Sequence, residues 1–376
     1  MQGIYQFMHL KKILFFVILS FAAQAQVLKD AWSKNTIKAG LQAMYNFDFK
    51  ESAQHFSLIK SKYPAHPAGY LLSAMQIEWQ YFPLKDHPQQ SKVYIQLLEK
   101  CFSLSENMYQ KNENDLDAAF YCSASLGFLA AEEANNDNFM KAVSYAKKGY
   151  HFLKIGTENV DRQPEFLYAA GIYHYYRIAY PELHTMIKPF MWFFMDGNKK
   201  LGLQQLEKAG KEATFVKNEA LFYLPYVYNK YEGNTTAGLS ISEMLTNDYP
   251  DNPIYNLQRA ELLTLSKKFE EASPFLEKLL KSKNRYFEAC YFTLEGFKME
   301  AQNNLKIAEA HYLKSTFLPF EEKFTKDIRG LSYLGLARIH LKTGQKQTAK
   351  KYLHLAEKFI EYKNSREEFE RLKKLL

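Results

Sequence analysis

The stretch LSYLGLARIHLKTGQKQTAKKYLHLAEKF, residues Leu331–Phe359, decides the fold class of this chain. Large and small residues recur at helical spacing on both sides of a short polar segment, which predicts two antiparallel helices. The positions that set this pattern are Tyr333, Leu336, Ala337, His340, Ala349, Leu353 and Ala356. We expect Ala337 and Ala349 where the two helices cross, because only a small side chain lets two backbones approach closely.

The small position of Ala349 recurs upstream at Ala308, Ala272, Gly238 and Gly202. The successive spacings are 41, 36, 34 and 36 residues, which indicates a repeat of about 34 residues with small insertions. Four residues after these anchors lie Tyr312, Leu276, Ser242 and Leu206. In the first helices, Gly296 and Ala260 hold the small position well, whereas Tyr226 holds it poorly, so that repeat is degenerate.

Weaker matches continue toward the N-terminus. They comprise Ala142, Ala146 and Gly149 in one segment, and Ser52, Phe56, Ile59 and Pro64 in another. Between them, 68–82 and 90–110 show amphipathic spacing without the consensus. We therefore predict an all-α fold of about eight helical pairs in a right-handed α-α superhelix, with 365–376 as a C-terminal cap.

These offsets resemble the tetratricopeptide repeat (TPR) family over most of the chain. The resemblance implies a concave groove lined by the first helix of each pair, in which that family binds its ligands. The groove positions that it implies are Tyr223, Lys230, Tyr231, Gln258, Glu261, Phe297, Arg338 and Lys342. Their mixture of aromatic, amide and charged side chains suits a protein or extended peptide. The alternative is a groove filled by the chain's own N-terminal helices.

Residues 171–233 are also similar to the inclusion-body clearance family of tetratricopeptide proteins. The similarity rests on an aromatic-rich helix, an Asp-Gly turn and a GLxxL helix in YPELHTMIKPFMWFFMDGNKKLGLQQLEKA. That family is cytosolic and linked to lipid droplets, whereas we expect this chain to be exported. The similarity therefore implies a shared architecture rather than a shared role.

The N-terminus predicts export. Lys11 and Lys12 precede an apolar run from Ile13 to Ala22, and Ala23-Gln24-Ala25 is typical of a cleavage site. The apolar run is too short to span a bilayer. The first cysteine after it is Cys101, so we expect a periplasmic, secreted or cell-surface protein rather than a lipoprotein.

We divide the chain into five segments: a signal peptide at 1–25, degenerate helical pairs at 26–160, an irregular aromatic-rich helical segment at 161–214, the main repeat array at 215–363 and a basic capping helix at 364–376. Cys101, Cys122 and Cys290 are too few for a disulfide framework. Either Cys101 pairs with Cys122 across neighbouring helices, or all three are isolated buried thiols.

Composition and charge are consistent with this organisation. Hydrophobic residues make up 47% and aromatic residues 16%, whereas the chain has only 16 Gly and 12 Pro, which favours a large helical core. From Lys342 onward the basic residues outnumber the acidic ones. This excess is either the solvated face of a capping helix or a contact for an anionic partner. The aromatic stripe Phe166, Tyr173, Tyr176 and Tyr180 is either core or an exposed aromatic shelf.

The sequence contains no HExxH, CxxC, GxSxG, GxGxxG or Walker pattern. The segment DGNKKLG is not a calcium loop, because Lys200 and Leu201 occupy the places of a ligand and the required glycine. We interpret it as architecture, with Asp196 or Asn198 capping a helix and Gly202 at a close helix contact. The pattern leaves Lys199 and Lys200, in the first turn of that helix, without an explanation.

We therefore expect a non-enzymatic, exported scaffold without cofactor or metal, which binds a protein or peptide in its groove. We expect no nucleic-acid partner and no transmembrane segment. One alternative is a soluble lipid- or glycan-binding envelope protein, suggested by the aromatic helices. The other is a hydrolase that uses Glu182 and His184, the tightest acid and base pair in the sequence.

Overall fold

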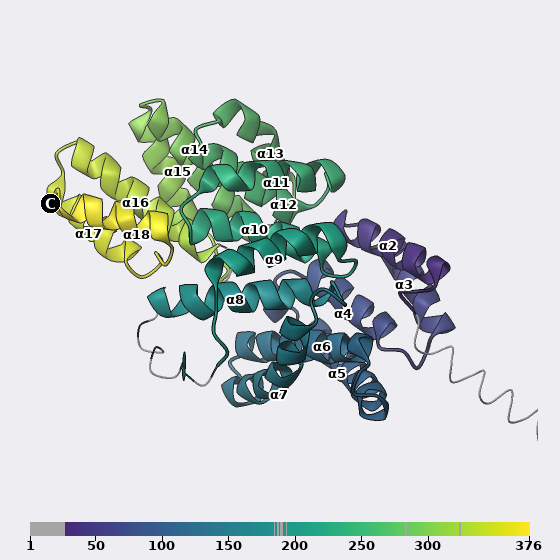
Figure 1. Cartoon of the computed structure of the whole chain (residues 1–376). Helices are drawn as coiled ribbons and strands as arrows, with labels where there is room; N and C mark the ends of the chain where they lie inside the picture. Colours follow the sequence, from purple (N-terminus) through teal and green to yellow (C-terminus); the bar gives the residue numbers. More distant parts are fainter. Residues whose placement is uncertain are drawn as a thin grey trace, which may run out of the picture. The chain divides into compact units, whose positions relative to one another are not determined.

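The protein folds into α-helices, as the repeat pattern predicts (Figure 1). The computed structural model describes residues 27–183, 185, 188, 191–192, 194–282, 284–322 and 325–376. These residues form seventeen α-helices and one short 3-10 helix, and none of them forms a strand. The predicted signal peptide at 1–25 lies outside the described residues.

The chain divides into two compact units, the first ending at Ala170 and the second running from Gly171 to Leu376. The first contains α2 (Ala31–Tyr45), α3 (Phe49–Lys62), α4 (Ala68–Gln80), η2 (Leu84–Asp86), α5 (Pro88–Lys111), α6 (Leu116–Asn135) and α7 (Phe139–Glu158). Helix α8 (Phe166–Leu183) contains the division between the units. The second unit continues with α9 (Lys199–Glu212), α10 (Lys217–Lys230), α11 (Thr235–Asp248), α12 (Pro253–Leu265), α13 (Phe269–Lys281), α14 (Arg285–Ala301), α15 (Leu305–Phe317), α16 (Lys326–Lys342), α17 (Lys346–Ala356) and α18 (Lys363–Lys373).

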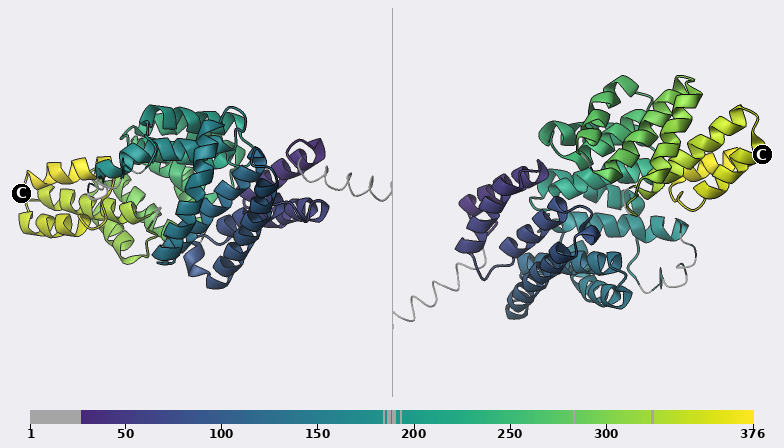
Figure 2. Two further views of the ribbon diagram at one scale, coloured as in Figure 1. Left: turned by 60° about the horizontal axis from the view of Figure 1, so that its bottom comes forward. Right: turned by 180° about the vertical axis from the view of Figure 1, so that it is seen from behind.

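Consecutive helices pack in pairs, from α2 with α3 to α16 with α17, and α18 packs on the last pair. In the second unit the first helices of successive pairs, α10, α12, α14 and α16, also contact one another in order. The views in Figure 2 show this stacking of helices within the unit. The predicted all-α fold of about eight helical pairs with a C-terminal capping helix is confirmed.

One turn geometry recurs between the two helices of a pair. The turns of five pairs contain a residue with φ between 59° and 78°, namely Phe47, Asp137, Lys267, Asn303 and Gly344. The next residue donates its backbone N–H to the carbonyl five positions earlier, at 2.8–2.9 Å, which closes the carboxyl end of the first helix. The repeat is therefore present in the backbone even where its turn has no glycine.

The degenerate repeat departs from this geometry. After Gly233, the amide of Asn234 donates to the carbonyl of Tyr228, six residues earlier, at 2.7 Å. The close helix contact is made by Pro225 rather than by Tyr226, since a Cβ on Gly238 would lie 3.1 Å from the Pro225 Cα. Pro225 therefore takes the contact position that a small residue has in the other repeats.

The small residues lie at close contacts, as predicted. A Cβ on Gly202 would lie 2.7 Å from the carbonyl oxygen of Gly171 and from the amide nitrogen of Tyr175, so two backbones meet there. A Cβ on Gly296 would lie 2.5 Å from the Tyr312 ring. The repeat alanines are all buried, namely Ala260, Ala272, Ala308, Ala337 and Ala349. Asn198 caps α9 by accepting a hydrogen bond from the Leu201 amide at 3.0 Å.

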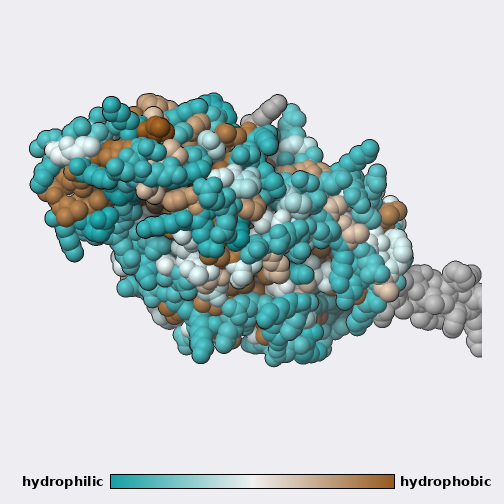
Figure 3. All heavy atoms as spheres, turned by 90° about the horizontal axis from the view of Figure 1, so that it is seen from above, coloured by the Kyte–Doolittle hydropathy of each residue, from teal (hydrophilic) through white to brown (hydrophobic). Residues whose placement is uncertain are grey.

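Cys101, Cys122 and Cys290 are free and buried, which decides between the two alternatives for them. The aromatic stripe of α8 runs from core to surface, since Phe166 is buried and Tyr180 is 43% exposed. None of the helices within the described ranges combines the length and apolar character needed to cross a bilayer. The face drawn in Figure 3 is mostly hydrophilic, with apolar residues gathered in separate patches.

Candidate functional site

The carboxyl end of α10 is the centre of the candidate site. Tyr223 and Lys230 belong to α10, and Tyr231 is its C-terminal cap. The other predicted groove residues follow on the next first helices: Gln258 and Glu261 on α12, Phe297 on α14, and Arg338 and Lys342 on α16. These residues therefore lie on successive first helices of the second unit, but their exposure to solvent differs widely.

A buried ion cluster joins three of these helices. The ammonium group of Lys230 contacts the carboxylates of Glu261 on α12 and Asp327 on α16, and all three side chains are buried. Asn229 donates to the same Glu261 carboxylate at 3.3 Å. Because Asp327 lies in the first turn of α16, the cluster brings the carboxyl end of α10 against the amino end of α16.

The cluster carries two acids for one base. Burial alone would lower the pKa of Lys230, but Asp327 and Glu261 raise it by more. The pKa of Lys230 therefore lies above the ordinary value for lysine. Burial raises the pKa of Glu261, and Asp327 adds to the rise while Lys230 opposes it. Two of the eight predicted groove residues, Lys230 and Glu261, are thus neutralised inside the protein rather than presented to a ligand.

A cluster of tyrosines lies beside the ion cluster. Tyr176 of α8 makes edge contacts with Tyr223 and Tyr231, at centroid distances of 6.3 and 5.1 Å. Tyr226 packs against both Tyr223 and Tyr231. These four side chains are half-buried, yet burial raises the pKa of each phenol. A half-buried phenol with a strongly desolvated hydroxyl indicates a recessed position rather than a convex surface.

Residues 359–365, here called the closing segment, comprise the end of the connection from α17 and the first turn of α18, and they cover this end of the unit. The Tyr362 ring packs on Tyr226 and Tyr231 at centroid distances of 5.8 and 5.5 Å, and its hydroxyl contacts that of Tyr226. The Lys230 ammonium lies 5.6 Å from the centre of the same ring. Tyr362 is buried, so it covers both the tyrosines and the ion cluster.

The neighbours of Tyr362 attach the closing segment at both sides. Asn364 and Lys363 donate to the carbonyls of Asn229 and Glu232 at 3.4 and 3.3 Å. At the other side, a Cβ on Gly330 of α16 would lie 3.1 Å from Ile360, so the segment passes close to that helix. The chain's own C-terminal segment therefore fills this end of the predicted groove.

The remaining groove residues are held by polar partners. Gln258 is buried and donates to the Phe222 carbonyl of α10 at 2.9 Å. The same helix contains Pro225, which has no backbone N–H to donate. Arg338 lies over the Phe297 ring at 4.9 Å and pairs with Glu300 and Glu368 at 2.6 Å. Lys342 is exposed and donates to the side-chain oxygen of Asn303 at 2.6 Å.

Tyr362 and Asp327 were missed by the sequence analysis. Tyr362 lies between two helices, where helical periodicity assigns no face, and 136 residues separate it from Tyr226. Asp327 is an ordinary first-turn acid in the sequence. The one available signal was the tyrosine in an otherwise charged connection, EYKN, at 361–364.

The predicted acid and base pair is only partly described. Glu182 makes an ion pair of 2.5 Å with Lys199, whereas His184 lies outside the described residues. This pair explains Lys199 in the first turn of α9, because its charge is balanced by the acid on α8. Arg177 holds the same region by donating to the carbonyls of Met191 and Met195 at 2.5 and 3.0 Å.

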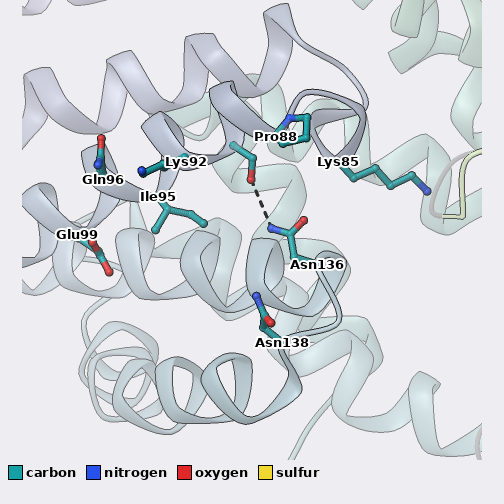
Figure 4. Close-up of a pocket in the computed structure, with 9 residues that line it drawn as sticks. Lys85, Pro88, Lys92, Ile95, Gln96, Glu99, Asn136 and Asn138 are labelled. Carbon is teal, nitrogen blue, oxygen red and sulfur yellow. Dashed lines mark hydrogen bonds between the residues drawn. The ribbon is translucent and has the colours of Figure 1, made fainter.

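The first unit has an open cleft of about 450 Å³ between α5 and the α6–α7 turn (Figure 4). Its lining includes Lys85, Lys92, Glu99, Asn136 and Asn138. Asn136 donates a hydrogen bond of 3.4 Å to Ser91, which is the dashed line at Asn136 in Figure 4. Ser91 and Asn136, which both line the cleft, thus partner each other.

Three of the lining side chains, Ser91, Asn136 and Asn138, donate to two buried glutamates. Glu132 accepts hydrogen bonds from Ser91 and Asn136 at 2.5 and 3.1 Å, and Glu133 accepts one from Asn138 at 2.7 Å. Among the residues that the structure describes, no group of three or more His, Cys, Asp and Glu side chains is placed to hold a metal ion.

The fold defines an all-α protein built as a stack of helical pairs, and its candidate site is the covered end of the second unit. No family model matches the chain, and no curated protein matches it either.

Proposed function

We propose that this chain is an exported, non-enzymatic tetratricopeptide-type scaffold that binds a protein segment at the carboxyl end of α10. The observation that carries the proposal is the group of half-buried tyrosines Tyr176, Tyr223, Tyr226 and Tyr231 on the inner helices. Tyrosine gives a large, amphipathic contact surface, and it is enriched in protein interfaces and among their strongest contacts.

The backbone around the tyrosines supports the same role. The carbonyl of Asn229 in the last turn of α10 and that of Glu232, just after its C-cap, accept hydrogen bonds from side chains of the closing segment. A helix carboxyl end carries partial negative charge and favours amide or basic donors. Aromatic contacts with backbone acceptors are the features by which extended segments are bound.

The location that we propose, the periplasm or the cell surface, rests on the basic residues, the apolar run and the Ala-Gln-Ala site of the first 25 residues. N-terminal sequencing of the exported protein tests it. A mature chain that begins at Gln26 is the expected result, and an uncleaved chain retained in the cytoplasm contradicts it.

Affinity capture with the mature chain from its own envelope fraction tests the binding role. We expect Tyr223→Ala and Tyr231→Ala to lose the captured protein while circular dichroism stays helical. Tyr228→Ala is the matched control, because Tyr228 lies on the same helix and donates to Glu207 of α9 at 2.9 Å. Equal capture by all three variants would place the interaction elsewhere on the molecule.

A further inference from the structure

The closing segment meets the surface around Tyr226 in the way that a bound ligand would. It has left α17 and enters α18 only at Lys363, so Tyr362 is presented from a non-helical connection. Its ring packs on both Tyr226 and Tyr231, and the two residues after it donate to carbonyls at the carboxyl end of α10. An aromatic anchor followed by two donors is a compact recognition pattern.

The polar contacts of the closing segment with the α10 end are weak, whereas Phe359 at its start packs on Phe320 and Tyr333. Lys363 and Asn364 are exposed, and their hydrogen bonds of 3.3 and 3.4 Å lie at the long end of the normal range. Tyr362 is the buried contact on the α10 side. The later turns of α18 have their own attachment through Phe369, Leu372 and the Glu368 pair with Arg338, so this part of the helix stays bound without the Tyr362 contact.

We propose that residues 359–365 are an internal ligand of the partner-binding surface, and that the partner is a protein segment carrying a tyrosine followed by basic and amide side chains. This inference rests on the proposed function and names the partner's chemistry. The partner places its tyrosine between Tyr226 and Tyr231, and its basic side chain at the Glu232 carbonyl, where the helix end is negative.

The internal ligand sets a threshold for binding. A segment tethered this closely has an effective concentration on the order of millimolar, so it competes with any partner at lower concentration. The apparent affinity for the partner equals the intrinsic affinity multiplied by the fraction of molecules in which the segment is displaced. Removing Tyr362 therefore raises the affinity of the surface for an added segment.

The test uses a fluorescent peptide with the sequence of 358–368, KFIEYKNSREE, and the mature full-length chain. Fluorescence anisotropy should show saturable binding to the Tyr362→Ala variant that is at least about tenfold tighter than binding to the wild type. The same peptide with alanine in place of its tyrosine is the control and should not bind. Tyr362→Phe keeps the ring, so it should behave much like the wild type.

Hydrogen exchange on the wild-type protein provides a second measurement that needs no variant to fold. The amides of the closing segment should exchange at least about tenfold faster than those of α16 and α17, which shows that the segment opens without unfolding. Exchange that occurs only together with α16 would overturn the inference, even if the variant aggregates.

The outcomes separate this inference from the proposed function. Failure of the peptide to bind a folded Tyr362→Ala chain, or equal binding to variant and wild type, overturns the internal-ligand inference. Neither result bears on capture of a partner by other residues of the unit. If Tyr223→Ala loses capture but the peptide fails to bind, the proposed scaffold function stands. The proposed chemistry of the partner segment is then rejected.

Discussion

Arg338 of α16 donates to both carboxylate oxygens of Glu300 on α14, at 2.8 and 2.6 Å. The same guanidinium pairs with Glu368 of α18 at 2.6 Å, and the Arg338 and Glu300 side chains are largely buried. One side chain therefore joins the last two first helices to the capping helix. A two-point contact of this kind fixes orientation as well as charge.

Replacement of Arg338 by alanine should destabilise the protein by about 3 kcal/mol, because Glu300 then loses its cation while still mostly buried. Chemical denaturation monitored by circular dichroism measures this loss. Arg371→Ala is the control, since Arg371 is exposed and lies 3.4 Å from Glu368. Its loss should change the free energy of unfolding by less than about 1 kcal/mol. Equal effects would show that the Arg338 contact does not hold the helices together.

His66 makes the first unit sensitive to acid. Its Nδ1 accepts a hydrogen bond from the Ala68 amide at 3.1 Å, so a neutral imidazole caps the start of α4. Burial lowers the pKa of His66 from 6.5 to about 4. Since the folded pKa is lowered, the unfolded chain takes up the proton first, and stability is lost as the pH falls from 6.5 to about 4.

The loss from His66 should reach about 3 kcal/mol at the acid end of this range. Denaturation curves for the wild type and His66→Asn at a series of pH values isolate the effect. Asparagine can cap a helix but does not titrate in this range. We expect the wild type to lose more stability than the variant on acidification. Parallel loss in the two proteins would assign the acid sensitivity to other groups.

The recurring turns offer a stabilising substitution. Lys267 has a φ of 59°, a left-handed conformation that costs a residue with a Cβ roughly 1 kcal/mol. Lys267→Gly should therefore raise the free energy of unfolding by about 0.5–1 kcal/mol. Gly344→Ala makes the opposite change in the equivalent turn, where φ is 78°. It should lower the free energy of unfolding by about 1 kcal/mol. Thermal melts of both variants measure the contrast, and a shift of the same sign in both would refute the strain argument.

Gly202 and Gly127 should respond oppositely to the same change. A methyl group on Gly202 would meet two backbone atoms at 2.7 Å, so Gly202→Ala forces α8 and α9 apart and should cost about 1–3 kcal/mol. A methyl group on Gly127 of α6 would meet nothing within 4 Å, and alanine favours an exposed helix by about 0.5–1 kcal/mol. Denaturant titration of the two variants should show one loss and one gain. Two gains would mean that the helices do not meet at Gly202.

The repeat was predictable because residue size reports helix contact directly. Ala272 and Ala308 are small where helices cross, and size is visible in a sequence. The shared turn geometry was hidden, since Phe47 and Lys267 are not residues that favour a positive φ.

The contacts at the covered carboxyl end of α10 could not be predicted from the repeat pattern. Periodicity assigns Lys230 to a face of its helix, but it does not predict that Asp327, 97 residues later, contacts the Lys230 ammonium group. Tyr362 belongs to a connection with no period at all. The sequence therefore located the first helices and their inner faces, whereas burial of Lys230 and Glu261 required the folded unit.

The buried ion cluster makes the stability of the second unit depend on a single base. Lys230→Met should destabilise it by about 3–5 kcal/mol, because Glu261 and Asp327 are left buried without a cation. Glu261→Gln keeps the Lys230 pair with Asp327 and should change stability by less than about 1.5 kcal/mol. Denaturation of the two variants at neutral pH measures this difference.

The pH dependence separates charge from packing in this cluster. The folded pKa of Glu261 is raised above 4.5, so the folded state takes up a proton more readily than the unfolded chain. The Glu261 carboxylate therefore lowers the stability of the protein as the pH rises through its folded pKa. This stability is regained as the pH falls toward 4.5. The deficit of Lys230→Met relative to wild type should shrink on acidification, whereas a deficit caused by lost packing would stay constant across the same range.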